Sequence, residues 1–171
     1  MFDLFSDPVK VAQQLQIIFS EYGFATWETL YSLLLEVVFA YVIGLPLGVL
    51  LVTGEKGGIR PLPAPVMKVI NVVINLLRSV PFLILMIIVF PLSKIIVGTK
   101  IGTIATIPPM VIAAFPLVAR MVEGSLREVN HGVIEASQSM GASTWQIITK
   151  VLLPEALPSL ISGGTITLGT I

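Results

Sequence analysis

The feature that most restricts the fold is the apolar run from Leu30 to Val52, which contains a single charged side chain, Glu36. A helix crosses the hydrocarbon core of a bilayer with about 20 apolar residues. In lipid each backbone N–H and C=O has to be paired within the segment, and a helix achieves this. Trp27 and Tyr31 stand at the start of the run, where aromatic rings favour the headgroup level. The run therefore predicts a membrane-spanning helix.

Composition extends this prediction to the whole chain. Charged residues make up 12% of the sequence and hydrophobic residues 55%, whereas soluble domains carry about 25% charged residues. Further apolar stretches lie within Val72 to Val97 and from Ile101 to Ala119. We therefore expect an all-α, polytopic membrane helix bundle.

The later apolar stretches carry two further expectations. Pro108, Pro109 and Pro116 should kink the third span, which membrane helices tolerate when neighbours satisfy the freed carbonyls. The last stretch, Leu157 to Ile171, is shorter than a full crossing. We expect the bundle to be truncated in its fourth span and the native gene to continue beyond this point.

A pair of glycines in the first span indicates helix packing. Gly44 and Gly48 form a G-x-x-x-G pair that lets another helix approach closely. Pro46, which lies between them, implies a kink.

Three polar side chains are expected inside the membrane: Glu36, Asn75 and Arg78. An Arg that faces lipid at mid-membrane costs about 2.5–3.5 kcal/mol on insertion scales, so Arg78 should not face lipid. Asn75 and Arg78 belong to a polar stripe with Lys68 and Asn71 on one helix face. The stripe lines the bundle interior or rests at the membrane interface, and Glu36 is a candidate partner of Arg78.

A cluster of charges follows the third span. Arg120 with Glu123 and Glu123 with Arg127 have i,i+3 and i,i+4 spacings, which predict a solvated, ion-paired helix face.

The N-terminal segment, residues 1–25, is expected to be an amphipathic helix separate from residues 26–171. Asp7 and Pro8 suit an N-cap and the first helical position, and Gly23 is a candidate stop. Several glutamines make this helix too polar to span a bilayer. It either lies on the membrane surface or packs in the bundle.

Residues 135–154 predict a helix, a break and a second helix. Gly141 is placed where the first helix should end, because glycine adopts the left-handed conformation without steric cost. Ser143 with Gln146 forms a capping-box pattern, so the second helix should start at about Thr144. Pro154 predicts a bend or a new helix.

Several classes of function are excluded by what the sequence lacks. Ten basic and ten acidic residues balance, so there is no electrostatic footprint for nucleic acid. The chain has no cysteine and a single histidine, His131, which rules out the familiar zinc motifs. It also lacks the G-x-x-x-x-G-K-[ST] phosphate cradle. We expect no catalytic, cofactor-binding or metal-binding residues and no enzymatic activity in this chain.

The helix–break–helix resembles the EAA signature of ABC-importer permeases. The matching residues are Glu135, Ala136, Ser137, Gly141, Val151, Leu153 and Pro154, with Ser137 in place of the second alanine and Val151 in place of an isoleucine. In that family the loop docks into a cleft of the ATPase subunit. More of the chain is similar to the methionine-uptake permeases, at Trp27–Leu30, Val42–Leu51, Arg78–Phe82, Ile96–Thr99, Ala119–Glu123 and Leu152–Pro158.

The resemblance implies a type I importer permease with five spans in the bacterial inner membrane. It further implies a homodimer in the lipid bilayer, a dimer of ATPase subunits that hydrolyses ATP, and a periplasmic or lipid-anchored substrate-binding protein. The implied function is a translocation pathway for an amino acid, namely D- and L-methionine. The alternative is a membrane scaffold or assembly protein that uses the 135–154 hairpin as a docking peg. Basic residues in the loops place the signature on the cytoplasmic side.

Overall fold

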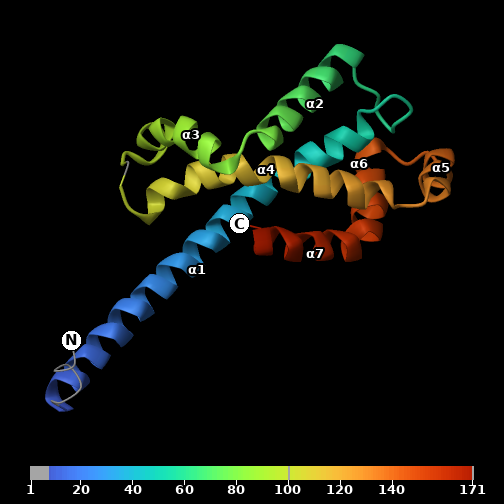
Figure 1. The fold of residues 1–171 in the computed structure, drawn as a ribbon. Helices are drawn as coiled ribbons and strands as arrows, with labels where there is room; N and C mark the ends of the chain where they lie inside the picture. Colours follow the sequence, from blue (N-terminus) through green and yellow to red (C-terminus); the bar gives the residue numbers. More distant parts are fainter. Residues whose placement is uncertain (1–7, 100, 171) are drawn as a thin grey trace.

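The computed structural model describes residues 8–99 and 101–170, and this part of the chain is helical without strands (Figure 1). The predicted all-α fold is confirmed. In chain order the elements are α1 (Pro8–Thr53), α2 (Ala64–Ser79), α3 (Phe82–Val97), α4 (Thr103–Arg127), α5 (His131–Ser139), α6 (Thr144–Ile147), the π-helical turn η1 (Ile148–Leu152) and α7 (Leu153–Thr170).

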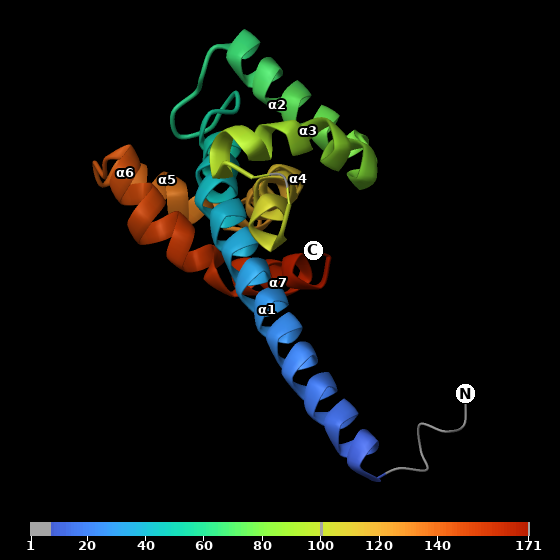
Figure 2. The same cartoon turned by 90° about the vertical axis from the view of Figure 1, so that its left-hand side faces the viewer.

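Helix α1 is one helix of 46 residues, about 70 Å long at 1.5 Å per residue. The expected stop at Gly23 is therefore wrong. Gly23 lacks a positive φ, and a glycine inside a helix costs only about 1 kcal/mol, which a long apolar helix tolerates. The N-terminal part of α1 extends away from the other helices (Figure 2). Asp7, the expected N-cap, lies outside the described residues.

Helices α2 and α3 are bent by 110° at the short break between them, here called the elbow. Val80 is extended, with ψ 128°, because the ring of Pro81 disfavours helical geometry at the preceding residue. The stretch from Val72 to Val97, expected to contain the second span, therefore contains a sharp bend. Two helices, Gln16–Thr53 and Thr103–Arg127, are long and apolar enough to cross a membrane within the described residues. The bent pair is a third if it counts as one span.

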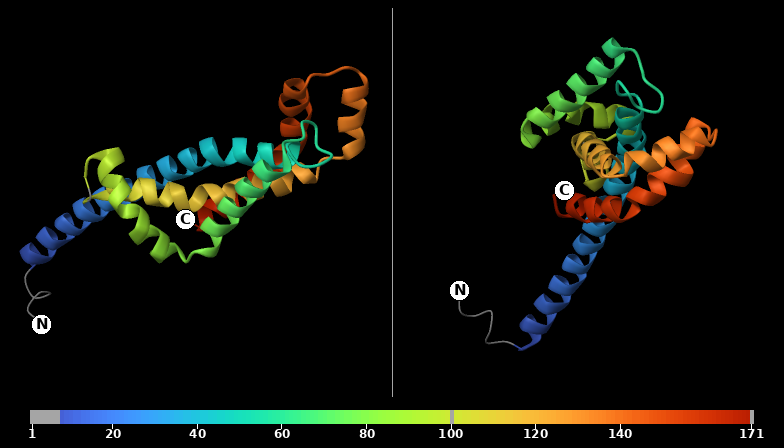
Figure 3. Two further views of the ribbon diagram at one scale, coloured as in Figure 1. Left: turned by 90° about the horizontal axis from the view of Figure 1, so that it is seen from above. Right: turned by 90° about the vertical axis from the view of Figure 1, so that its right-hand side faces the viewer.

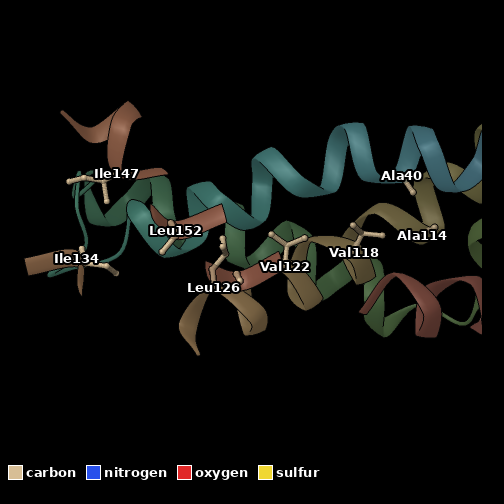
Figure 4. Close-up of a cluster of buried hydrophobic side chains, with 9 residues drawn as sticks. Ala40, Ala114, Val118, Val122, Leu126, Ile134, Ile147 and Leu152 are labelled. Atoms are coloured by element: carbon tan, nitrogen blue, oxygen red, sulfur yellow. The ribbon is translucent and has the colours of Figure 1, made fainter. Parts of the chain in front are cut away.

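Helix α4 lies at the centre of the bundle and contacts α1, α2, α3 and α7. It runs as a single helix through Pro108, Pro109 and Pro116, all of which are buried. Its buried side chains form the main apolar cluster together with residues of α1, α5, α6, η1 and α7 (Figure 4). That cluster contains Ala40, Ala114, Val118, Val122, Leu126, Ile134, Ile147, Leu152 and Ala156.

The backbone of α1 lies directly on α4. Every fourth residue of α1 is buried from Ser32 through Glu36 and Ala40 to Gly48. A Cβ atom added to Gly44 would lie 2.7 Å from the Cβ atom of Val118, and one added to Gly48 would lie 2.6 Å from that of Val122. Both distances are too short for real Cβ atoms, so the contact requires glycine at these two positions.

Replacing Gly48 by alanine should separate α1 from α4. The added methyl group would also meet the carbonyl oxygen of Ala119 at 2.8 Å, and overpacking of this kind costs about 1–3 kcal/mol. The matched control is Gly23→Ala in the same helix, since Gly23 has no atom within 4 Å of the added Cβ. We expect a lower thermal midpoint for Gly48→Ala in detergent and an equal or higher one for Gly23→Ala. Equal midpoints for both variants would contradict the close contact.

Candidate docking site

In the structure the hairpin comprises residues 130–154. Its first half is α5, which is capped at both ends. The Asn130 side chain accepts a hydrogen bond from the N–H of Gly132 at 2.8 Å, which starts α5. Gly141 has φ +78°, and its N–H donates to the carbonyl of Gln138 at 2.9 Å. The N–H of Ala142 donates to the carbonyl of Ser137 at 3.1 Å. Together these two bonds form a Schellman motif, which ends α5 where the sequence predicts.

The second half begins with the predicted capping box. The Ser143 N–H donates to Oε1 of Gln146 at 2.8 Å, and the Gln146 N–H donates to the Ser143 hydroxyl at 3.4 Å. Helix α6 starts at Thr144, as predicted. The chain then passes through η1, and α7 begins at Leu153, one residue before Pro154. Figure 1 shows the chain changing direction between α6 and α7.

The signature residues divide between an inner and an outer face. Ser137 is buried and its hydroxyl donates to the Val133 carbonyl at 2.8 Å. Val151 and Leu153 are half-buried against the main cluster. The exposed signature residues are Glu135, Ala136, Gly141 and Pro154.

Two large apolar side chains are exposed beside the outer face of the hairpin. Met140 is 80% exposed and Trp145 is 72% exposed. The hairpin projects from the end of the bundle opposite the N-terminal part of α1 (Figure 3). Exposed apolar residues on a projecting element with a polar rim are typical of a protein–protein contact. Sequence reasoning missed these two residues, although both flank the break at Gly141.

The base of the hairpin is tied to the loop between α1 and α2. Arg127, the last residue of α4, pairs with Glu55 of that loop at 2.6 Å and with Glu123 at 3.0 Å. A cavity of about 280 Å³ lies between the loop and α5 and is lined in part by His131 and Gln138. The ends of α1 and α4 are thus linked to each other at the base of the hairpin.

The expected polar stripe of α2 divides at its C-terminal end. Asn71 and Asn75 face α4, where their side-chain oxygens accept hydrogen bonds from Nη2 of Arg120 at 2.7 and 3.0 Å. Arg78 is exposed and lines a cavity of about 530 Å³ between the elbow and α4. Asn71 is half-buried at this contact, whereas Asn75 remains exposed apart from its hydrogen bond to Arg120. In the sequence, the i,i+4 spacing of Asn71 and Asn75 indicates that both side chains lie on one helix face and could bind one partner.

The candidate partnership of Glu36 with Arg78 is not formed. Glu36 is 5% exposed on the face of α1 that packs on α4, and no ion pair involves either residue in the described part of the chain. The sequence does not show which helix lies beside Glu36. In the structure α1 packs mainly on α4 and has few contacts with α2, which carries Arg78.

The charged face of α4 is ion-paired as the spacing predicts, but it is solvated only at Arg127, whose side chain is 48% exposed. Arg120 Nη1 lies 2.6 Å from Oε2 of Glu123, which in turn pairs with Arg127. Glu123 is only 8% exposed. The expectation of a solvated face is wrong for Glu123 and largely for Arg120, because α2 and the loop after α1 lie beside this part of α4.

The described residues contain no group of three or more His, Asp or Glu side chains that could hold a metal ion. His131 lies 3.9 Å from Glu135, and both side chains are exposed.

Membrane-length apolar helices packed in a bundle, with a capped helical hairpin at one end, define a polytopic α-helical membrane protein. The family described as "Binding-protein-dependent transport system inner membrane component" matches residues 44–171. The chain belongs to this family, and the resemblance seen in the sequence is confirmed.

Individual relatives support the same assignment. The chain is 50% identical over 147 residues to the probable D-methionine transport system permease protein MetI of Vibrio cholerae, covering 86% of this chain and 65% of that protein. It is 47% identical over 145 residues to the D-methionine transport system permease protein MetI of Escherichia coli K12, covering 85% and 66%. The chain therefore spans slightly less than two thirds of the length of these relatives.

A solved structure of the MetNI methionine ABC transporter in an inward-facing conformation is similar in fold as well as sequence. The TM-score is 0.81 at 47% identity, and the match covers 84% of this chain and 66% of that one. The two chains therefore share the same arrangement of helices over the matched part.

Replacing Ser143 by alanine should loosen α6 specifically. It removes one arm of the capping box, which is worth about 0.5–2 kcal/mol. The matched control is Ser139→Ala, since the Ser139 hydroxyl donates only to the Glu135 carbonyl within α5. Hydrogen exchange should become faster at Trp145 to Ile147 in Ser143→Ala and stay unchanged there in Ser139→Ala. Identical exchange in both variants would mean that the capping box does not hold the hairpin.

Proposed function

We propose that this chain is the permease subunit of an ATP-driven importer in the bacterial inner membrane and forms the pathway for methionine in its D and L forms. The single observation that carries the proposal is the capped hairpin 130–154. It bears the signature residues, projects from the bundle, and exposes Met140 and Trp145.

The hairpin is suited to passing force from a partner to the membrane helices. It lies between α4 and α7 in the chain. Its inward side chains Ile134, Ile147 and Leu152 belong to the main apolar cluster. A hydroxyl contact of 3.0 Å between Ser125 and Ser159 further joins α4 to α7. Packed interiors transmit displacement because they compress little. A partner that moves the hairpin would therefore move α4 and α7 as well.

The partners follow from the family and from what the chain lacks. Since the sequence contains no phosphate cradle of the G-x-x-x-x-G-K-[ST] type, ATP hydrolysis is assigned to a separate ATPase subunit that receives the hairpin. The family description names a binding-protein-dependent system, which supports a substrate-binding protein on the opposite side of the membrane. We further propose that two copies of the permease surround the pathway.

The substrate is proposed from the relatives. Two of them, at 47–50% identity, are named as D-methionine permeases. The test is uptake of labelled D- and L-methionine into vesicles that hold the full-length protein with its ATPase and binding protein. ATP-dependent uptake that excess unlabelled methionine abolishes is the expected result. Uptake that is absent, or that another amino acid competes away more strongly, would overturn the substrate assignment. A scaffold protein would bind partners without any uptake.

Gly141→Asp should abolish ATPase stimulation and uptake while the protein still inserts. A side chain at φ +78° is strained, and the added carboxylate lies at the exposed tip that is to enter the ATPase cleft. The matched control is Gly124→Ala, since Gly124 is an exposed helical glycine of α4 with no atom within 4 Å of an added Cβ. Normal uptake by Gly141→Asp would exclude docking through this turn.

A further inference from the structure

Arg120 holds three separate partners on two helices. Its Nη2 donates to the side-chain oxygens of Asn71 and Asn75 on α2, and its Nη1 donates to Glu123 on its own helix. Its Nε atom is buried and has no hydrogen-bond partner in the structure. A buried polar group of this kind is costly for stability, and apolar packing is often as stable as a buried ion pair. Stability alone is therefore a weak reason for an arginine at this position.

Helix α2 is joined to the bundle by a small apolar contact, in which Met67 and Ile70 are half-buried, and by the hydrogen bonds of Arg120. Ile74 is its single buried residue and packs in a small cluster with Leu51 and Ala119. Five large apolar side chains of α2 are exposed: Val66, Val69, Val72, Val73 and Leu76. Arg120 thus supplies the side-chain hydrogen bonds that join α2 to α4.

The same contacts continue toward the docking hairpin. Glu123 accepts hydrogen bonds from both Arg120 and Arg127. Arg127 also donates to Glu55 in the loop that leads into α2. It ends α4 only three positions before Asn130, the N-cap of α5. At its other end α2 runs into the elbow at Val80 and Pro81.

We propose that Arg120 is a positioning residue that makes α2 move together with the docking hairpin, and through α2 sets the position of the elbow. Displacement of the hairpin shifts the end of α4, and Arg120 transfers that shift to Asn71 and Asn75. The elbow borders the cavity of about 530 Å³ beside α4, so the shift changes the shape of that cavity. The role of this movement in transport rests on the proposed function, whereas the mechanical link does not.

The mechanical link is tested by spin-label distances. These 171 residues contain no cysteine, so Lys68→Cys on α2 and Glu128→Cys at the base of the hairpin place one labelled pair on exposed positions of each permease copy. Distances within one copy are isolated by mixing the labelled protein with an excess of unlabelled protein before assembly. We expect a narrow distance distribution in the unsubstituted full-length protein in nanodiscs. It should widen in Arg120→Gln and in the double variant Asn71→Leu with Asn75→Leu.

Two further variants sharpen this measurement. Arg120→Lys should be intermediate, because an ammonium group lacks the planar fork that reaches several acceptors at once. Arg60→Gln removes the same charge from an exposed arginine in the loop between α1 and α2, and it should leave the distribution narrow. If Arg120→Gln does not fold, the asparagine double variant decides. An unchanged distribution in that double variant would overturn the proposal.

The second readout is the number of ATP molecules hydrolysed per methionine imported by the complete complex. A merely structural defect lowers hydrolysis and uptake in proportion. Loss of the link should instead raise the ratio roughly five-fold or more, the lower end of typical coupling between sites. An unchanged ratio together with widened distances would overturn the role in transport, and absence of methionine uptake in every version would instead count against the proposed substrate.

Discussion

The close contact between α1 and α4 is the constraint on which the rest of the structure depends. Gly44 and Gly48 leave no room for a side chain against Val118 and Val122. In lipid there is little hydrophobic gain from bringing helices together, so close backbone approach and van der Waals packing supply the association. Because α4 also contacts α2, α3 and α7, its fixed position on α1 determines where those helices pack.

Two breaks in the helical pattern have different physical origins and different consequences. At the elbow, Pro81 forces Val80 into an extended conformation, and the chain bends by 110°. At the hairpin, the hydrogen bonds around Gly141 end one helix and the capping box at Ser143 starts the next. The first break redirects a helix beside α4, and the second presents an exposed surface at the end of the bundle.

A group of ion-paired side chains around the buried Glu123 lies where α2, α4 and the loop after α1 meet. Glu123 lies between Arg120 and Arg127, so each charge in this group has an opposite charge within hydrogen-bond distance. Pairing of this kind is what makes a buried carboxylate tolerable. The group lies between α2 and the base of the hairpin.

The sequence by itself determined the helical class, the hairpin with its break at Gly141, the capping box at Ser143 and the packing character of Gly44 and Gly48. Each depends on local chemistry: hydropathy over a span, the φ preference of glycine, or hydrogen bonds within a few residues. Only the tertiary structure decided that α1 continues through Gly23, that Asn71 and Asn75 bind Arg120, and that Glu36 and Arg78 stay apart. The physical reason is that helical periodicity fixes which residues share a face, whereas the neighbour that covers the face is set by packing between distant segments.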